Sequence, residues 1–145
     1  MKELRIERRF PVAPAMVFAF VTETENLVKW WGPEGTSLGE HNLDLSKTGD
    51  WFFVLVDPAG GRTRVSGVVL EVDPPNRVEF TLVLPSKEGP AEIDSVVRFE
   101  ISPDGAGGTV LVLTQTGLTS EQIVEGSTNG WISTLTRLER LLSKL

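Results

Sequence analysis

Residues 120–145 read SEQIVEGSTNGWISTLTRLERLLSKL, and this stretch decides the fold. Its apolar residues recur at intervals of four, three, four and three, a spacing that places them on one stripe of an α-helix. They are Trp131, Leu135, Leu138, Leu142 and Leu145. Ser120 is a good N-cap because its hydroxyl can accept from the first free backbone N–H groups. The pattern predicts one helix over residues 121–143, about 35 Å long at 1.5 Å per residue.

The chain before this helix has the pattern of short strands separated by turns. Apolar and polar residues alternate most clearly in 77–84 and 93–102, as expected of half-buried strands. The Gly- and Pro-rich turns between strands are short and favour hairpins over parallel crossovers. The predicted strands are 3–10, 37–45, 50–56, 63–72, 77–84, 93–102 and 109–116.

Two short helices are predicted between the first and second strands. Pro14 suits the first turn of a helix, and Val17, Phe18 and Val21 would form its apolar face. The second helix includes Leu27 and Val28. The elements together predict one α+β domain over residues 1–145, in which a curved antiparallel sheet of six or seven strands surrounds the C-terminal helix.

Composition narrows the classes of function. The chain has 145 residues, 40% hydrophobic and 23% charged, without cysteine, so disulfides and thiolate chemistry are excluded. The formal charge of −6 argues against nucleic acid. The charged N-terminus and the lack of a long apolar run predict no membrane partner and a cytoplasmic location. His41 is the single histidine, which gives little support to a metal site.

Several short motifs resemble one family in order and spacing. They are residues 26–33 (NLVKWWGP), 49–53 (GDWFF), Gly67, 71–78 (EVDPPNRV), 107–109 (GGT) and 130–131 (GW). The chain is similar to the START-like (SRPBCC) family named for the activator of the heat-shock-protein-90 ATPase. The resemblance implies the helix-grip fold, a cavity between sheet and long helix, an apolar small-molecule ligand in many relatives, and a link to stress response. It implies no cofactor.

Large apolar side chains are the candidates for lining that cavity. They are Trp30, Trp31, Trp51, Phe53, Phe80, Phe99, Trp131 and Leu135. Buried aromatic residues belong more often to the core than to a ligand site, so both interpretations stay open. Neighbouring helical side chains point about 100° apart, so we expect one of the Trp30–Trp31 pair to face the core and the other a rim.

Gly130 and Glu71 complete the set of candidates. A glycine inside a helix costs about 1 kcal/mol relative to alanine, so Gly130 suggests close packing, a helix bend or space for a ligand. Glu71 shares a strand face with Gly67 and Val69 if alternation holds. There it would be a buried acid and a possible polar contact; the alternative is a surface carboxylate paired with Arg77 or Arg64.

Three functions are compatible with these residues. The first is non-catalytic binding of an apolar small molecule in the cavity. The second is a protein-interaction module that resembles the chaperone ATPase activator and binds a chaperone. The third is a cyclase- or hydrolase-type enzyme with Glu71 in proton transfer, for which a nucleophile–base pair is missing. We expect the first function and no catalytic residues.

Overall fold

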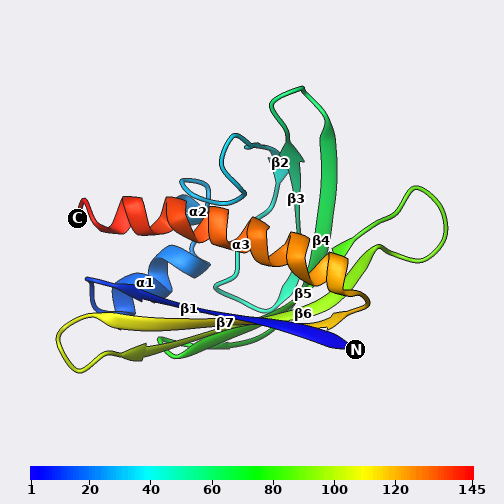
Figure 1. Cartoon of the computed structure of the whole chain (residues 1–145). Coiled ribbons are helices and arrows are strands. Elements are labelled where there is room, and N and C mark those ends of the chain that lie inside the picture. The colour runs from blue at the N-terminus through cyan, green and yellow to red at the C-terminus, as the bar shows by residue number, and fades with distance from the viewer.

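The long C-terminal helix lies across the inner face of one curved sheet (Figure 1). The structure is a computed structural model that describes residues 1–145. Its strands are β1 (Lys2–Phe10), β2 (Ser37–His41), β3 (Gly49–Val56), β4 (Arg62–Asp73), β5 (Arg77–Leu84), β6 (Ile93–Pro103) and β7 (Thr109–Leu118). Its helices are α1 (Pro14–Thr22), α2 (Thr24–Leu27) and α3 (Glu121–Leu142).

The seven strands form a single sheet of order β1-β7-β6-β5-β4-β3-β2, and every neighbouring pair is antiparallel. From β2 to β7 the order follows the chain, as short hairpin connections dictate. β1 pairs with β7, and the long connection from β1 to β2 contains α1 and α2. The predicted helix-grip architecture, with two short helices after the first strand, is therefore confirmed.

Helix α3 is continuous through Gly130, but only its C-terminal half is packed into the core. The hydroxyl of Ser120 accepts the backbone N–H of Ile123 at 3.1 Å, so the predicted cap is present. All buried residues of α3 lie from Trp131 onward, whereas none of residues 121–130 is buried. Leu145, the last member of the predicted stripe, is beyond the helix and exposed. The N-terminal half of α3 is only partly buried, with Ile123 and Val124 against the edge of the core.

Strand β2 is shorter than predicted. It ends at His41, although Leu43 and Leu45 are fully buried. The backbone of this segment binds the helical layer: Thr24 donates its hydroxyl to the carbonyl of Leu43, and Leu45 donates its N–H to the carbonyl of Thr22 at 2.9 Å. The leucines are thus buried between sheet and helices, outside the strand pairing.

A β-bulge in β4 decides between the two positions considered for Glu71. The register with β5 shifts by one residue between Val69 and Glu71, which reverses the alternation of side chains beyond the bulge. Val69 is buried, whereas Leu70 and Glu71 are both exposed. The Glu71 carboxylate accepts the Arg77 Nε–H at 2.7 Å. Of the two interpretations of Glu71, the surface carboxylate paired with Arg77 is the one that the structure contains, and the buried acid is wrong.

The core is one cluster of 28 buried apolar residues between the sheet and the helices. Gly67 permits a close approach within it: a Cβ at this position would lie 1.9 Å from the carbonyl oxygen of Thr81. Trp51 is directly opposite Gly67 in the β3–β4 register, and its Nε1 would lie 2.9 Å from that Cβ. The absent side chain of Gly67 therefore makes room for the Trp51 indole and for β5.

Candidate functional site

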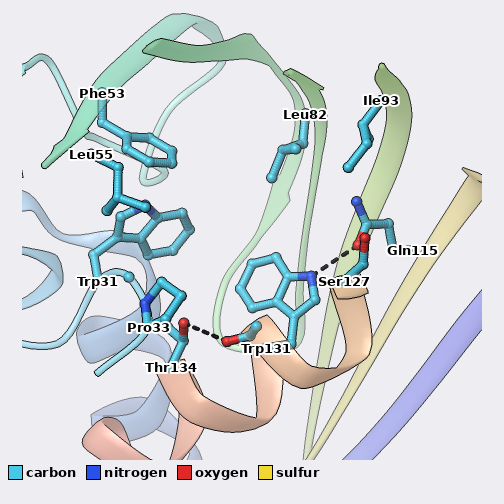
Figure 2. A pocket seen from close by; sticks show the side chains of 12 residues that line it. Trp31, Pro33, Phe53, Leu55, Leu82, Ile93, Gln115, Ser127, Trp131 and Thr134 are labelled. Atoms are coloured by element: carbon cyan, nitrogen blue, oxygen red, sulfur yellow. Dashed lines mark hydrogen bonds between the residues drawn. The ribbon is translucent and has the colours of Figure 1, made fainter. Parts of the chain in front are cut away.

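A cavity of about 150 Å³ lies beneath α3 and opens to solvent (Figure 2). Its walls come from the segment after α2, from strands β3, β5, β6 and β7, and from the middle of α3. The lining residues are Trp31, Gly32, Pro33, Phe53, Leu55, Leu82, Ile93, Gln115, Ser127, Gly130, Trp131 and Thr134. The cavity exists because α3 is packed tightly only from Trp131 onward.

Six aromatic side chains, three of them in the cavity wall, form a closed circuit. Successive ring centroids are 5.5–6.0 Å apart, in the order Trp31, Phe53, Trp51, Phe80, Phe99, Trp131 and back to Trp31. All contacts are edge-to-face except the stacked pair Trp51–Phe53. Such contacts add about 0.5–1.5 kcal/mol each beyond area burial, so the circuit holds the cavity rings in fixed orientations.

The predicted site residues separate into three groups. Those that line the cavity are Trp31, Phe53, Gly130 and Trp131. Those buried in the core away from it are Trp30, Trp51, Phe80, Phe99 and Leu135. Glu71 is outside both groups. The expected division of the tryptophan pair is present: Trp31 faces the cavity, whereas Trp30 is fully buried and donates its indole N–H to the carbonyl of Phe20 at 2.9 Å.

Gly130 faces open space. A Cβ built on Gly130 would meet no atom within 4 Å. The helix neither bends into two segments here nor receives a strand against this position. Of the explanations proposed for a glycine at this point, only space beneath the helix agrees with this geometry.

Gln115 is one of three polar lining residues, with Ser127 and Thr134, that sequence reasoning missed. Its Oε1 accepts the Trp131 indole N–H at 2.9 Å, and its Nε2 donates to the Ser95 hydroxyl at 2.9 Å. Ser95 in turn donates to the carbonyl of Leu82 at 3.0 Å. The signal was available, since Gln115 continues the inward alternation of Leu111 and Leu113, and a polar residue in that phase must be satisfied inside the protein.

The cavity wall formed by residues 31–33, and Glu34 directly after it, are attached to α3. Arg137 donates from one nitrogen to the carbonyls of Trp31 and Gly32, at 3.2 and 2.8 Å. The backbone N–H of Glu34 donates to the Ser133 hydroxyl at 2.9 Å, and Arg140 pairs with the Glu34 carboxylate at 2.9 Å. Hydrogen bonds from a charged donor are worth about 1.5–3 kcal/mol, so Arg137 is the main attachment of this wall.

No lining residue carries an ionisable side chain. Side chains with perturbed pKa values occur on the exposed surface instead. The backbone N–H groups of Ala106 and Gly108 lower the pKa of Asp104, and a hydrogen bond from Arg62 lowers that of Glu40. No three His, Cys, Asp or Glu side chains cluster closely enough to hold a metal ion. None of the helices is both long and apolar enough to cross a membrane.

Comparisons with known proteins agree with this architecture. The crystal structure of the AHSA1 protein from Silicibacter pomeroyi has a TM-score of 0.90 and 36% identity, with 98% of each chain covered. A protein from Nitrosomonas europaea has a TM-score of 0.80 and 29% identity, covering 98% of this chain and 94% of its own. A Chromobacterium violaceum protein at 24% identity shares the fold, with a TM-score of 0.82 and coverage of 97% and 96%.

The family comparison covers almost the whole chain. No relative was found among curated proteins. Residues 11–143 match the family described as Activator of Hsp90 ATPase homolog 1-like protein. The match includes the tryptophan segment before β2, the sheet from β2 to β7, and α3 with Gly130 and Trp131. The chain therefore belongs to the Activator of Hsp90 ATPase homolog 1-like family.

Proposed function

We propose that this protein binds an apolar small molecule, without catalysis, in the cavity beneath α3. The observation that carries the proposal is the open space under Gly130, bordered by the indole rings of Trp31 and Trp131. An internal helical glycine lowers helix stability by about 1 kcal/mol. At Gly130 this cost is offset by no packing contact, so keeping the cavity open is the role that the position supports.

The chemistry of the lining favours binding over reaction. Burial of apolar ligand surface is worth about 25 cal/mol per Å² before association costs. A few polar groups then suffice to orient the ligand, and Gln115, Ser127 and Thr134 are available in the wall. Acid–base catalysis would need an ionisable group within hydrogen-bond reach of the substrate. Glu71, the carboxylate considered for that role, is exposed and paired with Arg77 outside the cavity.

The test is a titration of the protein with a panel of apolar compounds that includes fatty acids, flavonoids and small aromatic compounds. Trp31 and Trp131 border the cavity, so we expect at least one class to shift the intrinsic tryptophan fluorescence and the amide spectra together. Calorimetry should give a negative heat-capacity change, the mark of apolar burial. A panel that leaves both spectra unmoved at saturation would overturn the proposal.

The family match supports a second candidate, binding to a chaperone. Its test is a pull-down with a purified Hsp90-type chaperone and an assay of the chaperone ATPase. A direct complex together with a changed ATPase rate would favour this function. The two tests can be told apart. A cavity ligand changes the spectral signals of Trp31 and Trp131 when no other protein is present, whereas chaperone binding needs the chaperone.

A further inference from the structure

The buried hydrogen bonds at one end of the cavity have a fixed direction. An indole N–H is only a donor, so the Trp131 bond requires the oxygen of the Gln115 amide to face Trp131. The amide nitrogen then faces Ser95. The single proton of the Ser95 hydroxyl is used toward the carbonyl of Leu82, so Ser95 must accept from Gln115. This series of hydrogen bonds joins four elements: α3, β7, β6 and β5.

This series of hydrogen bonds leaves one N–H donor of the Gln115 side chain without an acceptor. An amide nitrogen has two N–H groups, and Nε2 of Gln115 makes one hydrogen bond. Gln115 is only 2% exposed, and its side chain forms part of the cavity wall, with the amide beside Ile93 in Figure 2. A buried N–H without an acceptor costs free energy. The second N–H of Gln115 has no acceptor in the protein, and an acceptor atom inside the cavity would satisfy it.

The charge of the site restricts its occupant. None of the lining residues is ionisable, so a ligand group that carries a charge is disfavoured in the inner part of the cavity, away from its mouth and from Arg137. The adjoining hollow, which shares Ile93 and Ser127 with the cavity, contains the carboxylate of Glu92. A carboxylate ligand would meet this like charge at the boundary. Uncharged molecules are favoured over fatty acids for both reasons.

The size of the site is the second restriction. A cavity of about 150 Å³ is comparable to an engineered apolar cavity in another protein that accepts benzene. The edge-to-face pair of Trp31 and Trp131, with centroids 5.9 Å apart, presents ring faces and edges suited to another aromatic ring. One ring, or two fused rings, matches this space.

We infer that the cavity selects an uncharged one- or two-ring aromatic compound with a carbonyl acceptor, which receives the second N–H of Gln115. The inference rests on the proposed binding function and specifies its ligand class. Trp131 and Ser95 act as positioning residues, because their bonds fix the orientation of the Gln115 amide.

The experiment compares 1-tetralone with tetralin, which has the same ring skeleton without the carbonyl, and with 2-naphthoate, which carries a carboxylate. One neutral hydrogen bond makes the ketone bind about 3- to 10-fold more tightly than the hydrocarbon in the natural protein. In Gln115→Met the ratio should fall to about one. Thr136→Val is the control. It also removes a polar side-chain group, a hydroxyl that donates to the carbonyl of Ile132, but it lies outside the cavity and should keep the ratio.

A second measurement in the natural protein keeps the test independent of the folding of Gln115→Met. The side-chain amide of Gln115 gives two proton signals, and 1-tetralone should move the one that is not bonded to Ser95 downfield, whereas tetralin should not. Equal affinities for ketone and hydrocarbon, a ratio that persists in Gln115→Met, or tighter binding of 2-naphthoate would each overturn the inference. Binding of other panel members would then still support the proposed function, whereas no binding at all would refute both.

Discussion

Replacing Gly130 with leucine should stabilise the protein and weaken ligand binding at once. Leucine is a better helix former than glycine by about 0.8 kcal/mol. A Cβ at this position meets nothing within 4 Å, so no overpacking cost opposes this gain. Burying the rest of the side chain adds at most about 1.5–3 kcal/mol, and less here because the cavity is open. The expected stabilisation is about 1–3 kcal/mol.

The assay pairs a thermal melt with a ligand titration. At about 2–4 °C per kcal/mol for a chain of this length, Gly130→Leu should raise the Tm by about 3–8 °C. The new side chain occupies part of a 150 Å³ cavity. A ligand that loses about 60 Å² of apolar contact loses about 1.5 kcal/mol of binding, which is about tenfold in Kd.

The matched control is Gly126→Leu. Gly126 is four residues earlier on the same helix and also has no neighbour within 4 Å, but it lines the adjoining hollow and not the cavity. It should gain the helix propensity and keep the Kd. A clear fall in Tm for Gly130→Leu would mean that Gly130 serves tight packing. A raised Tm with unchanged Kd would mean that the ligand lies elsewhere. Either result refutes the reasoning.

Three further predictions concern the parts that support the cavity. Arg137→Met removes two charge-assisted hydrogen bonds and should lower the free energy of unfolding by at least about 1.5–3 kcal/mol. Arg140→Met removes only an exposed ion pair and should cost about 1 kcal/mol or less. Denaturant melts of both variants decide between these outcomes. Gly67→Ala should destabilise by more than about 1–3 kcal/mol, since its Cβ would lie 1.9 Å from the Thr81 oxygen, and a neutral result would contradict the close approach. The pKa of Asp104 is lowered from 3.8 in the folded state, so the stability that this carboxylate contributes is present at neutral pH and is lost as the pH falls below about 4. The difference in stability between the natural protein and Asp104→Asn should therefore shrink over that range. A difference that stays constant would refute the assignment of the lowered pKa to the backbone N–H groups of Ala106 and Gly108.

The elements of the fold could be predicted because their signals are local. The spacing of Trp131, Leu135, Leu138 and Leu142 requires a helix with one buried face, and the alternation from β5 to β7 requires strands. The errors arose where tertiary contacts decide. The bulge that turns Glu71 outward has no clear signal in the local sequence. Leu43 and Leu45 are as apolar as buried strand residues, so the sequence predicted a longer strand, although their backbone bonds to the helices.

The candidate site could be predicted in its aromatic part but not in its polar part. Each of the six rings in the circuit was identifiable as a large inward side chain, whereas the division into cavity wall and buried core depends on where α3 lies. Gln115 and Ser95 could have been found as polar residues in the inward phase of two strands. Their bond to each other depends on the β6–β7 register, in which Val97 pairs with Gln115.

A small apolar molecule should enter the cavity beneath α3, and the indole N–H signals report on this entry. In a titration with 1-tetralone followed by two-dimensional NMR, the signals of Trp31 and Trp131 should move most. The Trp30 signal should move less, because its N–H is bonded to the carbonyl of Phe20 away from the cavity. The amide of Gly105, in the turn between β6 and β7 and outside the cavity, should stay in place. Saturation with no movement of Trp31 and Trp131, or shifts centred on that turn, would contradict the account.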